Sequence, residues 1–472
     1  MKRRAWTMPA VAITVFLMAA VLVTARAQQS GQPKITNMDR QQAEEMLSRI
    51  HDAVKKDYYD PKFHGVDMDA RYQKYEAALK VAPTLGEAFR IVAAFLAGLH
   101  DSHTYFVPPS ISYRFDYGFR MQMIGDRCFI TEVRADSDAA SKIHPGDEIL
   151  KLGTYAVNRN DYSDIEYYLN SLAPQGEMAL LLRDPQGTTR SEAVRTKFLP
   201  GKKVGNLTLG AGGGDMWNLI LRQESLSHML RQRWVEIGDT FIWKIPAFNM
   251  TPDEIGGIMS KANKHGALVI DLRGNPGGSI DSLVDLAGYF FDHDVTIATP
   301  IGRKHEKEII AKPRGKPFTG KLFVLVDGGS ASASELFART IQLSHRATVL
   351  GDLTAGAVME SKIYPFQIGV GFQSYFVGRS VVGTSSSTAT GGNDLLVFYA
   401  ASITHDDLIM TDGKSLEKTG VTPDTMILPT VADLAAGRDP VLSQAVALAG
   451  AKLDPAAAGK LFPFEWAPLN GQ

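Results

Sequence analysis

The chain has 472 residues, of which 44% are hydrophobic and 21% charged, and its formal net charge is −1. This composition is typical of a globular protein with about two to four domains. A near-neutral balance of charge argues against nucleic acid as a partner. The single cysteine, Cys128, excludes an intramolecular disulfide and a cysteine-based metal cluster. We expect neither a metal nor a cofactor.

The first 27 residues predict an export signal. Basic residues at positions 2–4 precede an apolar run at 9–23, and Ala-Arg-Ala at 25–27 fits a cleavage site. The apolar run is shorter than the roughly 20 residues that a membrane span needs. We therefore expect an exported protein, periplasmic or secreted, without an integral membrane span in the mature chain. An uncleaved N-terminal anchor is the alternative.

Two segments with different sequence patterns follow the predicted signal. Residues 28–110 predict an N-terminal helical domain, because apolar residues such as Met46, Ile50 and Val54 recur at helical spacing. Residues 111–200 predict a small β-rich domain. Its expected strands are 119–124, 128–133, 148–152 and 178–183, its expected helix is 162–172, and a glycine-rich linker is expected at 204–214.

From residue 234 onward, expected strands alternate with expected helices. Strands are predicted at 240–246, 267–272, 322–326 and 347–350, with helices at 251–265, 281–291 and 335–343 between them. This alternation predicts an α/β core with a largely parallel sheet, here assigned to residues 201–430. Ligands in such sheets bind at the carboxyl ends of the strands. The remaining tail, 431–472, is expected to pack on the core as a helix or to contact a partner.

Two loops at those strand ends contain candidate catalytic residues. Residues 328–335 read Gly-Gly-Ser-Ala-Ser-Ala-Ser-Glu between a strand and a helix, where an exposed hydroxyl lies beside backbone N–H donors. A serine-rich helix cap is the alternative. Gly277 and Gly278 allow a backbone to approach a ligand closely, although a plain turn would also explain them. Neither a phosphate-binding loop nor a convincing dinucleotide fingerprint is present, so phosphate binding is not expected.

Three motifs in order resemble one clan of serine peptidases. They are Val-Ile-Asp-Leu-Arg-Gly-Asn-Pro-Gly-Gly at 269–278, Gly-Ser-Ala-Ser-Ala-Ser-Glu at 329–335 and Gly-Asp-Leu-Thr-Ala-Gly at 351–356. Together they are similar to the signature of the C-terminal processing (tail-specific) proteases and the tricorn core protease. The resemblance spans about 41–428. It implies a crotonase-like α/β core in a multidomain α+β chain, with a PDZ-like domain at 111–200.

The resemblance also implies a site. The nucleophile maps to Ser332, and the oxyanion donors map to the N–H groups of Gly278 or Gly277 and of Ala333. Where the Ser-Lys branch of the clan has its lysine base, this chain has Ala357. A serine hydroxyl without an adjacent base is a weak nucleophile.

The tricorn-like branch supplies its base from a Ser-His pair, which maps to Ser102 and His103. Histidine needs no large pKa shift to act as a base near neutral pH. The supporting carboxylate of that branch precedes the Gly-Val-x-Pro-Asp run and maps to Glu417. His100, Lys362, Glu360 and His405 are competing candidates, and we interpret Asp271 and Arg273 as polar groups that fix the glycine loop.

The expected function is that of an exported serine peptidase, a hydrolase acting on protein or peptide substrates recruited by their C-termini. A binding protein with a disabled site on the same fold, for peptides or lipophilic ligands, is the alternative. An acyl-CoA hydratase follows from fold analogy alone, and the export signal argues against it. Self-association is left open.

Overall fold

The computed structural model describes residues 35–109, 113–200, 231–304, 306–368 and 397–466. The predicted export signal and the predicted linker at 204–214 lie outside these residues. Among the helices described, none combines the length and the apolar character needed to cross a membrane.

A six-stranded sheet forms the centre of the α/β core. Its strand order is β10-β11-β12-β15-β16-β19, and every neighbouring pair is parallel except the antiparallel pair β10 and β11. The strands are β10 (Arg233–Ile237), β11 (Thr240–Lys244), β12 (Ala267–Asp271), β15 (Lys321–Val326), β16 (Thr348–Gly351) and β19 (Thr425–Met426). The predicted largely parallel sheet is therefore confirmed.

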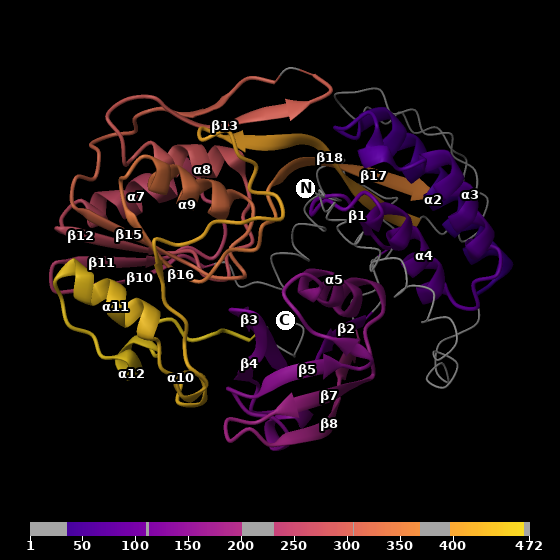
Figure 1. Cartoon of the computed structure of the whole chain (residues 1–472), viewed down its shortest axis with the longest axis horizontal. Coiled ribbons are helices and arrows are strands. Elements are labelled where there is room, and N and C mark those ends of the chain that lie inside the picture. The colour runs from indigo at the N-terminus through magenta and orange to yellow at the C-terminus, as the bar shows by residue number, and fades with distance from the viewer. Residues whose placement is uncertain (1–34, 110–112, 201–230, 305, 369–396, 467–472) are drawn as a thin grey trace, which may run out of the picture.

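Helices cover both faces of this sheet, as buried parallel strands require. Along β15, Leu322, Val324 and Val326 point to one core, and Phe323 and Leu325 point to the other. The first core is covered by α7 (Pro252–Ala262), α8 (Ile280–Ala287) and α9 (Ala333–Leu343). The second is covered by α11 (Pro440–Ala449) and α12 (Pro455–Ala458), next to α10 (Val431–Ala435) (Figure 1). The tail thus packs on the core, one of its two predicted roles.

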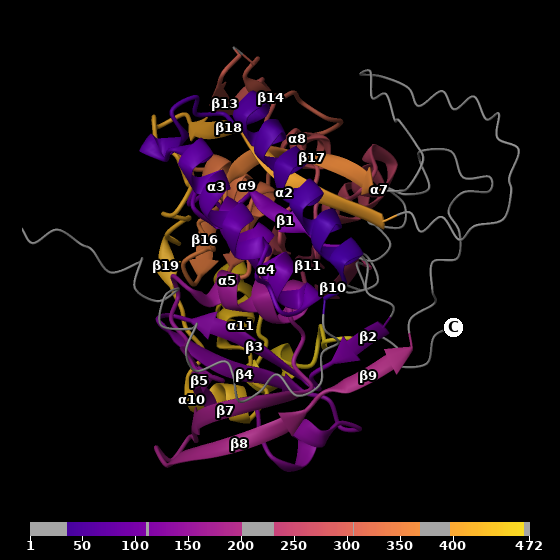
Figure 2. The same ribbon diagram turned by 90° about the vertical axis from the view of Figure 1, so that its right-hand side faces the viewer.

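A second sheet joins the N-terminal helices to the core. It comprises β1 (Tyr105–Val107), β18 (Val397–Met410), β13 (Val295–Gly302), β14 (Ile309–Ala311) and β17 (Met359–Ile368). The helices α2 (Asn37–Asp57), α3 (Met68–Leu79) and α4 (Leu85–Ala97), with the short η2 (Phe63–Gly65), pack on it through a shared apolar cluster (Figure 2). Because Tyr105 pairs with Ser402, β1 carries the preceding Ser102-His103 segment to the core.

The predicted β-rich domain is an antiparallel sheet with its own apolar cluster. Its strands run in the order β3 (Phe119–Ile124), β4 (Arg127–Val133), β5 (Glu148–Leu152), β7 (Glu177–Arg183) and β8 (Thr189–Arg195), and β6 (Tyr155–Ala156) pairs with β5. Also present are η3 (Asp138–Ser141), α5 (Tyr162–Tyr167), η4 (Tyr168–Leu172) and the ribbon β2 (Tyr113–Asp116) with β9 (Lys197–Pro200). Arg159 of this domain pairs with Asp352 at 2.7 Å, and Gln122 donates to Asp327 at 2.6 Å. These contacts place the domain at the carboxyl ends of β15 and β16.

Candidate active site

Ser332 lies at the turn between β15 and α9, as the N-cap residue of that helix. Its backbone has φ 54° and ψ −119°, a conformation that mirrors the first central position of a type II turn and favours glycine. A non-glycine residue held there costs roughly 1–3 kcal/mol. This strained conformation falls on the residue to which the resemblance maps the nucleophile.

The glycine loop packs directly against this turn, so the two predicted loops do meet. The main-chain oxygen of Asn275 accepts the N–H of Ala331 at 3.0 Å and the hydroxyl of Ser334 at 2.9 Å. A Cβ atom on Gly277 would lie 2.6 Å from the Cβ of Ser332. Because such a contact is too close, glycine is required at position 277.

The two predicted glycine donors differ in availability. The N–H of Gly277 is engaged, because it donates to Oδ1 of Asn275 at 2.9 Å. Within the described residues, the N–H groups of Gly278 and Ala333 have no hydrogen-bond acceptor. The N–H groups of Gly278 and Ala333 are therefore available to a ligand, whereas that of Gly277 is already occupied.

On the histidine side, a chain of hydrogen bonds runs from Glu417 to His103. The Glu417 carboxylate accepts the N–H of Ser102 at 2.8 Å and the Ser102 hydroxyl at 2.8 Å. The Ser102 oxygen lies 2.7 Å from Nδ1 of His103. A hydroxyl has one hydrogen. Since that hydrogen points to Glu417, the Ser102 oxygen accepts from Nδ1–H, which leaves Nε2 of His103 with its lone pair.

The surroundings of His103 keep its ring neutral. Burial lowers its pKa to about 4, the negative charge of Asp101 opposes this shift, and the positive charge of Lys418 adds to it. Asp101 also accepts the N–H of His103 at 2.9 Å. At neutral pH the imidazole is therefore unprotonated and able to accept a proton.

A backbone segment connects the serine turn to the histidine side. The N–H of Ser332 donates to the carbonyl of Ala357 at 2.9 Å, and the N–H of the next residue, Val358, donates to Glu417 at 2.9 Å. The predicted residues Ser332, Ser102, His103 and Glu417 thus belong to one connected network. No hydrogen bond joins the Ser332 hydroxyl to His103 in the described part of the chain.

Three of the four competing residues, Glu360, Lys362 and His405, form a separate group on β17 and β18, whereas His100 is exposed in the loop after α4. His405 contacts Asp406 and lies 3.8 Å from Glu360. Burial raises the pKa of Glu360, and the positive charge of Lys362 opposes this shift only in part. Ligand atoms of Glu360, His405 and Asp406 lie within 4.8 Å of one another, a spacing that could hold a metal ion. Within the described ranges, none of these residues forms a hydrogen bond or ion pair with Ser332 or His103.

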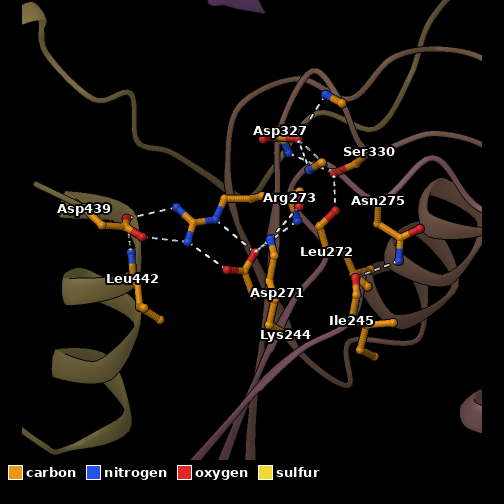
Figure 3. Close-up of polar contacts among 12 residues, drawn as sticks. Lys244, Ile245, Asp271, Leu272, Arg273, Asn275, Asp327, Ser330, Asp439 and Leu442 are labelled. Atoms are coloured by element: carbon orange, nitrogen blue, oxygen red, sulfur yellow. Dashed lines mark hydrogen bonds and ion pairs between the residues drawn. The ribbon is translucent and has the colours of Figure 1, made fainter. Parts of the chain in front are cut away.

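Asp271 and Arg273 belong to a buried ion cluster below the glycine loop (Figure 3). Arg273 lies 2.8 Å from Asp271 and 2.7 Å from Asp439, and Lys244 lies 3.1 Å from Asp271. Burial alone would raise the pKa of Asp271, but the charges of Arg273 and Lys244 hold it below its usual range. The cluster ties the strand end to α11, as the predicted loop-fixing role requires.

Two residues of the network were missed from the sequence. Glu335 binds the serine turn, and its signal was the Ser-x-x-Glu spacing of a capping box. Asp101 binds the backbone of His103, and its signal was only its position two residues before the histidine.

The α/β core thus presents a serine at a strand-to-helix turn and a neutral histidine in the same hydrogen-bonded network, an arrangement typical of a serine hydrolase. Comparisons with known proteins agree with this class. Residues 241–427 match the model of peptidase family S41, and residues 39–97 match the tricorn protease C1 domain. The chain thus carries a domain of the S41 serine peptidases, preceded by a segment of the tricorn C1 type.

Three relatives illustrate this similarity. A probable CtpA-like serine protease of Staphylococcus saprophyticus is 32% identical over 35% of this chain and 34% of its own length. The tail-specific protease of Haemophilus influenzae is 25% identical over 66% of this chain and 44% of its own. The crystal structure of mature CPAF superimposes with a TM-score of 0.58 at 17% identity, covering 84% of this chain and 95% of that one, a likeness of fold. The chain spans about a third of the length of the first curated relatives.

Proposed function

We propose that the chain is an exported serine peptidase in which Ser332 is the nucleophile and His103 its general base. One observation carries the proposal: Glu417, Ser102 and His103 form a continuous hydrogen-bonded relay that leaves Nε2 of His103 free to accept a proton. The relay is tied to the serine turn through the backbone of Ala357 and Val358. The match of residues 241–427 to the model of peptidase family S41 supports the same reaction class.

Each group has a role in peptide-bond hydrolysis. His103 removes the proton from the Ser332 hydroxyl as its oxygen attacks the scissile carbonyl, and the N–H groups of Gly278 and Ala333 stabilise the resulting oxyanion. The protonated His103 then gives its proton to the leaving amine as the carbon–nitrogen bond breaks. Water, activated by the same histidine, hydrolyses the acyl-enzyme. The relay of Ser102 and Glu417 and the charge of Asp101 stabilise the imidazolium that forms in between.

Substrate recruitment is assigned to the antiparallel domain, as a PDZ-like peptide binder. Among the strands that the structure describes, β3 lies at the edge of the sheet and pairs with β4 alone, and α5 belongs to the same apolar cluster. An edge strand presents unpaired backbone groups to which an extended peptide can add. The N–H of Gly118, in the loop that precedes β3, already donates to Asp116 at 2.7 Å. A peptide carboxylate at this loop would have to compete with Asp116.

The decisive experiment follows cleavage of unstructured peptides by the full chain and by the Ser332→Ala variant. Cleavage by the parent protein that disappears in a folded Ser332→Ala variant supports the proposal, and equal activity of the two contradicts it. Recruitment by the C-terminus is tested with the same peptides carrying an amidated end. Amidation should raise KM and leave kcat unchanged, and unchanged KM would contradict recruitment through the carboxylate.

A binding protein without catalysis is the second candidate. It is favoured by the lack of a hydrogen bond between Ser332 and His103 in the described residues. Catalytic hydrogen bonds are often long in ligand-free proteins and tighten with substrate, so this observation does not outweigh the relay. Peptide binding without cleavage by the parent protein would establish this alternative.

A further inference from the structure

The side chain of Glu335 is fully buried in the first turn of α9 and accepts four hydrogen bonds. Two come from backbone N–H groups on the far side of the site, Gly356 at 2.8 Å and Ala357 at 3.0 Å. A third comes from the Thr354 hydroxyl at 2.5 Å, and the fourth from the N–H of Ser332 at 3.1 Å. One carboxylate therefore holds the nucleophile turn against the loop that follows β16.

This contact fixes the conformation of Ser332. The backbone N–H of Ser332 donates both to the Glu335 carboxylate and to the carbonyl of Ala357. The N–H of Ala357 in turn donates to the Glu335 carboxylate. The three residues thus form a closed set of hydrogen bonds around the serine backbone. The next N–H along the chain, that of Ala333, is a proposed oxyanion donor, so the same set also aims that group.

Glu335 also acts on the histidine side through the backbone. Ala357 is followed by Val358, whose N–H binds the Glu417 carboxylate that holds Ser102. A shift of the loop at 354–358 would therefore move both halves of the site. In the Ser-Lys branch the corresponding loop provides the catalytic base. In this chain the backbone of the loop holds the serine turn in line with the histidine side of the site.

The ionised form of Glu335 is the one that can accept all four bonds, because a protonated carboxyl is itself a donor. The groups that touch it are neutral, and charged groups on the neighbouring elements pair elsewhere, Arg339 with Asp412, Lys418 with Glu417 and Asp352 with Arg159. Burial raises the pKa of Glu335 to about 7, against the lowering effect of its four donors. Protonation near neutral pH would remove acceptors from the serine turn.

We propose that Glu335 is a positioning residue whose carboxylate aligns Ser332 and the Ala333 N–H with the histidine relay, without touching substrate. The inference rests on the proposed peptidase function and deepens it. It makes the geometry of the nucleophile depend on the charge of a group that takes no part in the proton transfer itself.

The test compares kcat, KM and the pH profile of the parent protein with those of Glu335→Gln, which keeps the shape of the side chain and removes its charge. We expect kcat to fall on the order of 100-fold with KM within about twofold, since a small misplacement of reacting atoms costs that much. The limb near pH 7 over which activity rises as Glu335 ionises should disappear in the variant. Glu254→Gln is the matched control, because Glu254 occupies the same capping-box position in α7 and is exposed.

Two further measurements keep the outcomes apart. If Glu335→Gln does not fold, Glu335→Asp keeps the charge with a shorter reach, and it should lower kcat while retaining the limb. The amide hydrogens of Ser332, Gly356 and Ala357 should exchange faster in Glu335→Gln than in the parent protein. In the control variant they should exchange at the rate of the parent protein. Unchanged kcat with an unchanged pH profile in a folded variant overturns the inference. An inactive parent protein overturns the proposed function instead.

Discussion

The backbone N–H of Ser332 donates a 2.9 Å hydrogen bond to the carbonyl of Ala357. By the resemblance, Ala357 maps to the position of the lysine base in the Ser-Lys branch, and in this structure it contributes its backbone to the site. We propose that His103 acts as the base in place of a residue in the loop that contains Ala357. Strand β1 brings His103 to the core from a segment more than two hundred residues upstream.

The relay predicts a large loss of activity when either Ser102 or Glu417 is replaced. Ser102→Ala removes the acceptor that keeps the proton of His103 on Nδ1, so kcat should fall by about 10²–10⁴, the range of a positioned general base. The kcat of Glu417→Gln should fall within the same range, because the substitution removes the negative charge and one of the two oxygens that accept hydrogen bonds from Ser102. Steady-state kinetics on a peptide substrate measure both. Glu360→Gln, a half-buried carboxylate outside the relay, is the control and should retain full kcat. Equal activity of all three variants would refute the relay.

The low pKa of His103 makes a prediction about stability. The folded pKa is about 4, below the ordinary value of about 6.5, so the unfolded chain binds more protons between these values. The free energy of unfolding contributed by this residue should therefore rise from pH 4 to pH 6.5 and stay level above it. Thermal unfolding of the parent protein and of His103→Gln across this range measures the difference, which should shrink as the pH falls. A difference independent of pH would show that the ring is not buried in its neutral form.

Two glycine-to-alanine substitutions should differ in their effects: one should reduce activity and the other should increase stability. Gly277→Ala places a Cβ 2.6 Å from that of Ser332 at a φ of +102°, so it should displace the serine turn and reduce kcat at least 100-fold. Gly257→Ala lies in α7 with nothing within 4 Å of the added Cβ, and should stabilise the helix by up to about 1 kcal/mol. Kinetics and thermal unfolding of the pair give the answer, and full activity of Gly277→Ala would contradict the close packing of the two loops.

The buried ion cluster predicts a large loss of stability. Arg273→Ala leaves Asp271 and Asp439 without their shared partner, and removing one member of a buried pair costs about 3–5 kcal/mol. Arg49→Ala, at an exposed pair with Glu45, should cost about 0.3–0.5 kcal/mol. Denaturant unfolding of the two variants compares them directly. A loss at Arg273 no greater than that at Arg49 would mean that the cluster does not hold the loop.

Local patterns predicted much of the core. The strand expected at 119–124 coincides with β3, and that at 322–326 lies within β15, because periodicity and glycine boundaries are local properties. The long pairing of β17 with β18 was not predicted, because local patterns do not show which separated segments of the chain pair with each other. The candidate site shows the same difference between local patterns and contacts of distant segments. Motifs predicted Ser332 and Ser102-His103 separately, whereas the roles of Asn275 and Glu335 arise from contacts between loops distant in sequence.

The measurement that tests the central claim most directly is the rate at which a fluorophosphonate probe labels Ser332. It is compared in the parent protein, His103→Ala and Lys362→Ala, with labelling sites identified by mass spectrometry. If His103 is the base, the parent protein and Lys362→Ala label at the same rate, and His103→Ala is slowed by about 10²–10⁴. Undiminished labelling of His103→Ala, or loss of labelling in Lys362→Ala, would contradict the account.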